Sequence, residues 1–382
     1  TMPLTAPDFD AVTAWRRKLH AMPEVSGDEH QTAREVIAFL SHTQPDGVIA
    51  GIGGTGVAVI YHGDEPGPTV AIRAELDALP IAETGTPAWR SGFAGKGHMC
   101  GHDGHMAILA AVGLALGQKR PKRGRAVLLF QPAEETGAGS AAMIADHKFI
   151  GARPDITLSL HNMPGVPRGH VWLKTGTANC ASQGLRIVFT GRTAHAAQPQ
   201  TGLSPAGAIA SIIPALIGLS RGTLETGDFT LATITHVKIG EPAFGISPAN
   251  GEIWVTLRSQ TDAGMAALLT AAETLAREAA ARDGLKIAFE NHDVFRASVN
   301  HPDAVALLTT ALEAEGVPHS EGETMRASED FGRFADVSTS AMFFLGAGED
   351  HPALHNSDYD FPDELIPVGA RIFLRAIHAV LG

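Results

Sequence analysis

The segment TVAIRAEL (69–76), followed by GHMAILAAVGLALGQ (104–118) and AVLLF (126–130), decides the fold of this chain. The two short segments are apolar and of strand length, whereas the longer segment between them has the length of a helix. The same alternation recurs around DITLSL (155–160) and SAMFFLGAG (340–348). Short apolar strands that alternate with helices are typical of a mostly parallel sheet with helices on both faces. We therefore predict an α/β fold.

The middle of the chain follows a different order. It reads as a strand, a helix, two strands, a long helix and a final strand, at 185–191, 204–220, 229–240, 251–259, 262–284 and 285–290. This β-α-β-β-α-β order is that of the split βαβ, or ferredoxin-like, sandwich. We therefore predict that residues 181–292 form an inserted domain. It interrupts a discontinuous α/β domain made of residues 1–180 and 293–382.

The composition excludes several classes of protein. Hydrophobic residues make up 44% of the chain and charged residues 18%, which is typical of a folded globular protein. A formal net charge of −12 disfavours nucleic acids and anionic membranes as partners. The most apolar run, SIIPALIGL (211–219), is shorter than the ~18 residues that span a bilayer and contains Pro214. With two cysteines and no secretory pattern at the N-terminus, we expect a cytoplasmic protein.

Two local motifs have structural interpretations. GIGGTG (51–56) satisfies the dinucleotide-binding pattern G-x-G-x-x-G, but it leads into the strand pattern VAVIYHG (57–63) instead of a helix. We interpret it as a glycine turn. The segment 15–42 reads as two helices, and Ser26 and Glu29 have the spacing of a capping box for the second helix.

Side chains that bind metals collect at one edge of the predicted sheet. In chain order, the candidates are Asp77, Cys100, His102, His105, Glu134, Glu135, His161 and His355. Each lies just past a predicted strand or in HMCGHDGH (98–105), between two strands, and ligands of open α/β sheets bind at the carboxyl ends of the strands. Singly, each candidate has an ordinary explanation, such as a favourable helix dipole for acidic residues or packing for a cysteine. Together they favour a metal centre.

The types of donor atom narrow the choice of metal ion. One thiolate with several imidazoles and carboxylates suits Zn, Mn, Co or Ni better than Ca or Mg. The candidates are too many for one tetrahedral ion, so we predict a two-metal centre with one shared anionic group. Neighbouring side chains of an extended segment point to opposite sides, so one of Glu134 and Glu135 can bind metal while the other is a general base. A serine nucleophile lacks its G-x-S-x-G motif, and a Cys100 nucleophile would leave the glutamates without a role.

These motifs resemble those of the M20 metallopeptidase family, specifically its amidohydrolase branch, which includes hippurate hydrolases, aminoacylase-like enzymes and auxin-conjugate hydrolases. The resemblance covers nearly the whole chain and rests on the ordered set GIGGTGVAV, IRAELDALPI, HMCGHDGH, FQPAEETGAG, LHNMPGVPRG, GRTAHAAQPQTGLSP and SEDFGRF. It implies a catalytic domain with a binuclear metal centre and an inserted lid domain that forms a homodimer. It also implies hydrolysis of N-acyl amino acids or related amides to a carboxylate and an amine.

Carried over by position, the resemblance implies five metal ligands: Cys100, His102, Glu135, His161 and His355. Cys100 would bridge two divalent ions, and Glu134 would be the general base. His195, in the insert, would reach the active site of a dimer partner and contact the substrate or its developing oxyanion. Arg258 would bind the substrate carboxylate.

Other polar residues near the motif receive lesser roles. We expect Asp77 to orient a ligand histidine through its second ring nitrogen, and we expect His105 to be structural. His98 and Asp103 have no assigned role beyond packing or hydrogen bonding.

Some positions depart from the branch, and more than one function is compatible with the motifs. Gly245 stands where the branch commonly has Asn, and Ser357 and Asp358 replace a common Pro-Arg pair, so substrate specificity is open. One alternative is a dipeptidase or aminopeptidase on the same metal centre, although the chain lacks an obvious acidic cluster for a free α-amine. Another is a catalytically inactive, metal-dependent ligand-binding protein, which the presence of Glu134 disfavours.

Overall fold

The computed structural model describes residues 3–382, which form two compact units. The first contains the described residues up to Ala178 together with Val299–Glu323 and Asp330–Gly382, and the second contains Asn179–Ser298 and Thr324–Glu329. The second unit thus includes all of the predicted insert and extends beyond both of its ends. One reason is local pairing: the backbone N–H of Cys180 donates to the carbonyl of Met325 at 2.9 Å, which adds a distant segment to this unit.

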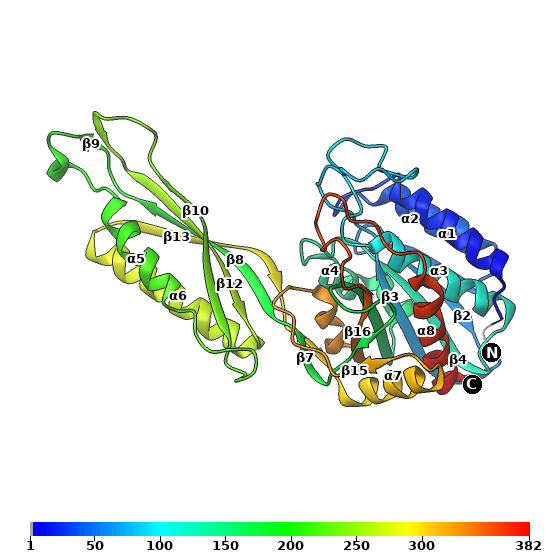
Figure 1. Ribbon diagram of the computed structural model, residues 1–382. Helices are drawn as coiled ribbons and strands as arrows, with labels where there is room; N and C mark the ends of the chain where they lie inside the picture. Colours follow the sequence, from blue (N-terminus) through cyan, green and yellow to red (C-terminus); the bar gives the residue numbers. More distant parts are fainter. Residues whose placement is uncertain (1–2) are drawn as a thin grey trace. The chain divides into compact units, whose positions relative to one another are not determined.

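An eight-stranded sheet forms the centre of the first unit (Figure 1). In spatial order its strands are β1 (Gly47–Ile52), β2 (Gly56–His62), β4 (Arg123–Gln131), β3 (Glu65–Glu75), β5 (Ile156–Pro164), β16 (Thr339–Gly348), β6 (Val171–Trp172) and β15 (His319–Ser320). The pairs β3–β4, β3–β5, β5–β16 and β6–β15 are parallel, and the other three are antiparallel. The predicted α/β fold with a mostly parallel sheet is confirmed.

Helices lie on both faces of this sheet. One group shares an apolar core with the strands: α1 (Ala6–His20), α2 (His30–Ser41), α3 (His102–Gln118), α7 (Pro302–Ala314) and α8 (Leu365–Leu381). A second group contacts β4, β1 and β16 from the other side: α4 (Gly139–Ala145) and the 3₁₀ helices η1 (His147–Ala152) and η3 (Asp330–Asp336) (Figure 1). Helix α3 is apolar around most of its circumference and is buried almost throughout, which places its first turn deep in the unit.

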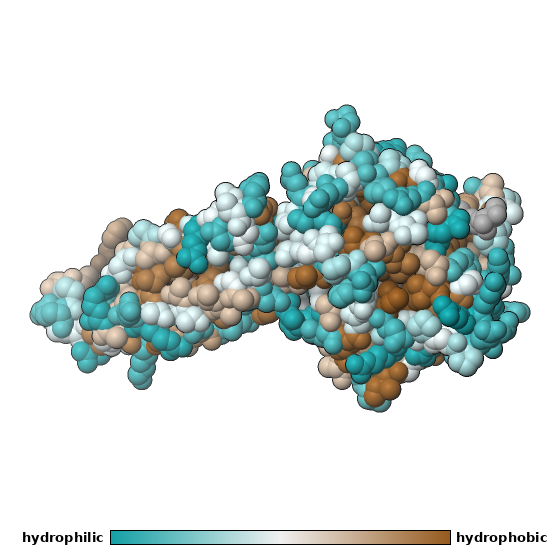
Figure 2. Space-filling model, turned by 90° about the horizontal axis from the view of Figure 1, so that it is seen from below, coloured by the Kyte–Doolittle hydropathy of each residue, from teal (hydrophilic) through white to brown (hydrophobic). Residues whose placement is uncertain are grey.

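The second unit is a four-stranded antiparallel sheet with two helices. Its strands lie in the order β10 (Thr230–Ile239), β12 (Asn250–Ser259), β8 (Ala181–Thr190) and β13 (Lys286–Phe295). Helices α5 (Ala206–Ile217) and α6 (Asp262–Arg282) pack on one face and share a core with the strands. This is the predicted β-α-β-β-α-β order. Figure 2 shows the side that carries α5 and α6, where brown apolar atoms alternate with teal polar ones.

Short elements complete the chain. Strands β9 (Ala194–His195) and β11 (Ile246–Ser247) pair with each other, as do β7 (Gly176–Asn179) and β14 (Ser298–Asn300), and η2 (Pro199–Thr201) is a single 3₁₀ turn. Across residues 3–382, no helix has both the length and the apolar character needed to cross a membrane.

The predicted capping box of Ser26 and Glu29 is wrong. Helix α2 begins at His30, so Glu29 itself occupies the N-cap position and Ser26 lies before the helix. The Ser26 hydroxyl donates to Asp77 at 2.7 Å instead of accepting from the helix. The Glu29 carboxylate accepts from the backbone N–H of Gly27 at 2.9 Å. Both side chains bind partners other than the helix N-terminus, and the spacing of the two residues in the sequence does not reveal these partners.

Candidate metal centre

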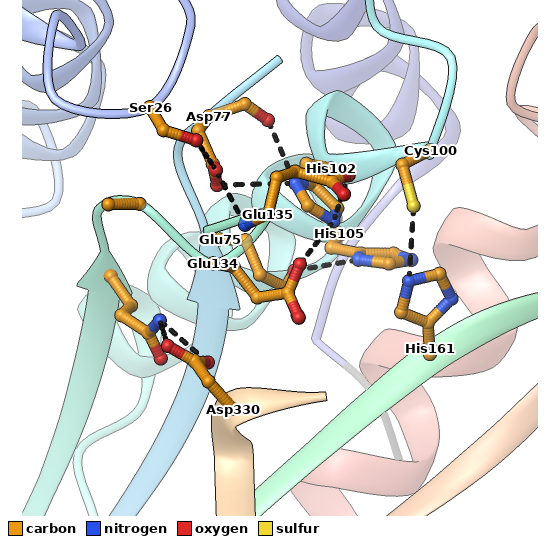
Figure 3. A network of polar contacts seen from close by, with 12 residues as sticks. Ser26, Glu75, Asp77, Cys100, His102, His105, Glu134, Glu135, His161 and Asp330 are labelled. Atoms are coloured by element: carbon orange, nitrogen blue, oxygen red, sulfur yellow. Dashed lines mark hydrogen bonds and ion pairs between the residues drawn. The ribbon is translucent and has the colours of Figure 1, made fainter. Parts of the chain in front are cut away.

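Four segments of the first unit bring the five predicted ligands to one edge of the sheet, and Figure 3 shows Cys100, His102, Glu135 and His161 among them. Cys100 precedes α3, and His102 is the first residue of that helix. Glu135 follows β4, and His355 lies in the loop after β16. His161 differs from the prediction, because it lies inside β5, which continues to Pro164 through its pairing with β16.

The donor atoms of these residues form two overlapping groups. Within each group, the atoms lie within 4.8 Å of one another: Cys100, His102 and His161 in the first, and Cys100, Glu135 and His355 in the second. The Cys100 Sγ is 3.5 Å from His161 Nε2, and the Glu135 carboxylate is 3.8 Å from His102 Nε2 and 3.5 Å from His355 Nε2. All five predicted ligands are therefore close together, and the thiol belongs to both groups.

The two buried histidines present their Nε2 atoms to the centre. The Nδ1 of His102 lies 2.8 Å from the carbonyl oxygen of Asp77, and the Nδ1 of His161 lies 2.7 Å from that of Asn162. A carbonyl can only accept, so Nδ1 carries the proton and Nε2 offers a lone pair. The Nε2 of His102 and the Oε1 of Glu135 are buried and have no hydrogen-bond partner within residues 3–382. Such orphaned donor atoms, facing each other across the centre, fit a divalent metal.

The buried carboxylates of the centre also favour a bound cation. Burial raises the pKa of the Cys100 thiol well above its usual range, and Glu135 and Glu134 raise it further. Burial alone would lower the pKa of His102, but the carboxylates of Glu75 and Asp77 raise it to about 10. Without a metal, this concentration of anionic groups favours bound protons. A divalent ion would replace those protons and stabilise the thiolate form of Cys100.

Glu134 lies beside the predicted ligands and is 5% exposed. Its carboxylate is 3.9 Å from His102 Nε2, and it forms a third group of donors with His102 and Glu135. The two adjacent glutamates thus both reach the centre, as Figure 3 shows.

Asp77 contacts this region through both its main chain and its side chain. Its main-chain carbonyl accepts from His102, whereas the closer oxygen of its carboxylate is 3.5 Å from the same ring nitrogen. The other carboxylate oxygen accepts from the backbone N–H of Glu135 at 3.0 Å. The side chain therefore holds the segment that carries the glutamates, and the main chain holds the histidine.

His105 connects several buried residues beneath the centre. Its Nδ1 lies 2.7 Å from the Glu75 carboxylate, and its Nε2 accepts from the backbone N–H of Asn162 at 3.0 Å. The Asn162 amide donates to the carbonyl of Cys100 at 2.8 Å and accepts from the Tyr359 hydroxyl at 2.6 Å. The sequence did not single out Asn162 or Tyr359, although Asn162 lies within the motif LHNMPGVPRG and Tyr359 directly follows Asp358.

Gly101 makes this arrangement possible. It has φ +84°, and an added Cβ would lie 2.4 Å from the Asn162 amide nitrogen and 2.6 Å from the Tyr359 hydroxyl. The glycine between Cys100 and His102 is therefore required both by its backbone conformation and by the lack of space.

Asp103, which had no assigned role, is bound by two cationic groups from α1. It lies 3.1 Å from Arg16 and 2.9 Å from His20, and all three side chains are fully buried. These contacts fix the first turn of α3 next to His102. His98 is also buried, and neither of its ring nitrogens has a hydrogen-bond partner among the described residues.

The remaining two predicted site residues belong to the second unit. His195 is exposed in β9, and its Nδ1 accepts from the backbone N–H of Ala197 at 3.0 Å. Arg258 is in β12 and donates to the carbonyl of Arg326 at 2.9 Å. The contacts described for these residues lie within their own unit, so their roles at the metal centre stay predictions.

The sequence profile of the peptidase family M20/M25/M40 matches residues 71–379. The chain belongs to this family. The predicted enzyme class, a metal-dependent amidohydrolase, is confirmed, as is the predicted resemblance. All five proposed ligands, from Cys100 to His355, lie inside the match.

Individual members of the family resemble the chain over almost its full length. It is 29% identical to a hippurate hydrolase of Campylobacter jejuni, over 94% of each chain. It is 26% identical to an N-acetylcysteine deacetylase of Bacillus subtilis, over 96% of each chain. A solved structure from Bacillus subtilis, described as a dinuclear metal binding peptidase of the M20 family, superimposes with a TM-score of 0.85 at 24% identity and covers 99% of each chain.

Proposed function

We propose that this enzyme hydrolyses the amide bond of N-acyl amino acids, with two divalent ions held by Cys100, His102, Glu135, His161 and His355. The observation that carries the proposal is the pair of buried histidines whose Nδ1 atoms are tied to carbonyls, so that both Nε2 atoms face Cys100 and Glu135. Two bound divalent ions supply Lewis acidity, which polarises a carbonyl and lowers the pKa of water.

The protein's own part in the reaction is proton transfer and positioning. The Glu134 carboxylate takes a proton from the attacking water and returns it to the leaving nitrogen, so that the amide C–N bond breaks and the products are a carboxylate and an amine. Its neighbours hold it 3.9 Å from His102. His195 supplies a donor to the oxyanion, and Arg258 binds the substrate carboxylate.

The substrate class is supported by the names of relatives. Besides the hippurate hydrolase and the N-acetylcysteine deacetylase, they include N-acetyldiaminopimelate deacetylases at 26–27% identity. A hydrolase for free peptides would need a group that pairs with an α-ammonium. Turnover of N-acetyl and N-benzoyl amino acids, compared with that of dipeptides with free amines, separates the two substrate classes.

The test of the catalytic roles compares two adjacent glutamates. The metal-free protein is reconstituted separately with Zn, Mn, Co and Ni, and metal content and turnover are measured. We expect Glu134→Gln to keep both ions and to lose turnover by about 10²–10⁴-fold, because the general base is missing. Glu135→Gln should instead lose bound metal. Activity of Glu134→Gln at full metal content would refute the role of Glu134.

The second unit is proposed to act as a lid and to form a homodimer. It carries exposed apolar side chains, of which Phe244 is 105% exposed, Ile246 57% and Trp254 45%. Exposed apolar side chains on one unit are a feature of interaction surfaces. Sedimentation velocity over a hundredfold range of protein concentration tests the dimer, and a constant monomer would refute it. Both cysteines are free and buried, which supports the cytoplasmic location that we propose.

A further inference from the structure

The turn that carries the two glutamates has a backbone that requires support. Ala133 has φ +49°, in the left-handed region that residues with a Cβ rarely adopt. Its carbonyl accepts from the backbone N–H of Gly139 at 3.1 Å, and its own N–H donates to the Glu29 carboxylate at 2.8 Å. Glu134 follows it directly in the chain. The conformation of Ala133 therefore sets the direction in which the Glu134 side chain leaves the turn.

Glu29 is fully buried and connects three segments of the first unit. Besides the N–H of Ala133, it accepts from the N–H of Gly27 at 2.9 Å and from the hydroxyl of Thr55 at 2.9 Å. None of these three hydrogen bonds goes to a proposed metal ligand. On the other side of Glu134, the N–H of Glu135 donates to Asp77. Glu134 thus lies between two peptide groups, each held by a buried carboxylate.

We propose that Glu29 is a positioning residue that holds Ala133 in its left-handed conformation and thereby directs the Glu134 carboxylate toward the metal centre. The inference rests on the proposed function in one respect, the role of Glu134 as general base. Misplacement of a reacting group by about 1 Å can cost ~10²-fold in rate. A displaced Glu134 would consequently lower kcat, whereas substrate binding and the metal ligands would be unaffected.

The same loop provides a matched control. The carboxylate of Glu24 accepts from the backbone N–H groups of Gln31 and Thr32 and from the Thr32 hydroxyl, at 2.6–3.0 Å. Glu24 therefore supports the start of α2 and has no hydrogen bond to the turn at 132–135. Glu24→Ala and Glu29→Ala remove the same group from the same loop, but only the second removes a support of Ala133.

The first experiment measures backbone protection and requires no activity. Amide hydrogen exchange is followed by mass spectrometry in a peptide that covers residues 131–137. In Glu29→Ala we expect the Ala133 amide to exchange at least tenfold faster than in the wild type, because its acceptor is gone. In Glu24→Ala this peptide should exchange at the wild-type rate. Unchanged protection of the peptide in Glu29→Ala would overturn the inference.

The second experiment measures turnover of an N-acyl amino acid after metal reconstitution. We expect Glu29→Ala to lower kcat by about 30–100-fold, with KM within threefold of the wild type and both ions bound. Glu29→Gln should recover most of kcat, because its amide oxygen can still accept from Ala133 while its NH₂ group donates to Thr55. A kcat of Glu29→Ala within twofold of the wild type would overturn the positioning role.

A double-mutant cycle with Ala133→Gly isolates the backbone conformation. Glycine adopts positive φ without a Cβ clash, so it needs the carboxylate less than alanine does. We expect the loss of kcat caused by Glu29→Ala to be at least threefold smaller in the Ala133→Gly background. Equal losses in both backgrounds would contradict the inference. If wild-type enzyme turned over no acyl or peptide substrate, the proposed function would fail, and the exchange experiment would still decide whether Glu29 holds the turn.

Discussion

Replacement of Arg16 by methionine should strongly destabilise the first unit. The guanidinium is fully buried and donates to Asp103 at 3.1 Å, Asp360 at 2.6 Å and Asp363 at 2.8 Å. The three carboxylates differ in exposure: Asp103 is 0% exposed, Asp363 18% and Asp360 28%. Most of the energy must therefore reside in the pair with Asp103, since ion pairs with solvent access contribute only ~0–1 kcal/mol.

The magnitude follows from what remains after the substitution. Removing one partner of a buried ion pair costs ~3–5 kcal/mol, because the other charge stays buried and uncompensated. Asp103 keeps His20 at 2.9 Å, so the cost should be near the lower end, about 3 kcal/mol. Because methionine keeps much of the apolar volume of the arginine side chain, the loss in free energy of unfolding comes mainly from removal of the charge. With a urea m-value of ~3 kcal/mol/M for a unit of this size, the unfolding midpoint should fall by about 1 M.

The assay is urea unfolding of metal-free protein, followed by tryptophan fluorescence, so that metal binding does not contribute to the free energy of unfolding. Arg17→Met is the matched control. Arg17 is 40% exposed, pairs with Asp363 at 2.8 Å and lies over the ring of Trp89. Its loss should cost no more than about 1 kcal/mol. Midpoints of the two variants within 0.2 M (about 0.6 kcal/mol) of each other would refute the reasoning.

Two further predictions concern pH and packing. Burial alone would lower the pKa of His20, but Asp103 and Glu83 raise it to about 10. This stabilising charge is fully present below the unfolded pKa of ~6.5 and is lost toward pH 10. The free energy of unfolding should therefore fall between pH 7 and 9, by at most ~1.4 kcal/mol per pH unit, and the urea midpoint should fall with it, less in His20→Gln. If the free energy of unfolding changed equally with pH in the wild type and in His20→Gln, this role of His20 would be excluded. Gly104→Ala should destabilise metal-free protein by about 1–3 kcal/mol despite alanine's helix propensity, because the added Cβ would lie 2.1 Å from the buried ring of Phe361. Gly207→Ala, with its nearest atom at 3.7 Å, should not lower the melting temperature.

The strands, and the gathering of candidate ligands at one edge of the sheet, were predictable because their signals are local. A buried parallel strand is apolar along its length, so β3, β4, β5 and β16 stand out in the sequence. Ligands at the ends of such strands then share an edge whatever the loop conformations are. His161 shows the limit of this argument, because the end of β5 is set by its partner β16 and not by its own residues.

The polar network beneath the centre was not predictable from local signals. Arg16 binds Asp103 across 87 positions of the chain, and Tyr359 binds Asn162 across 197. A polar side chain in a helix or loop is usually exposed, so its residue type alone does not indicate burial. The failed capping box has the same origin: Ser26 and Glu29 have the right spacing, but their side chains bind Asp77 and Ala133.

Asp77 shows that sequence reasoning can identify a residue without identifying the atom that acts. The residue was expected to orient a ligand histidine through its second ring nitrogen. That nitrogen of His102 lies 2.8 Å from the carbonyl oxygen of Asp77, which any residue at that position would provide, and the carboxylate holds the N–H of Glu135. The glutamate turn therefore depends on the carboxylate at position 77, whereas the closest contact of His102 is to the backbone after β3 and its carboxylate contact is longer, at 3.5 Å. Because main-chain groups are common to all residues, contacts such as those of His102 and His161 with backbone carbonyls cannot be read from the sequence.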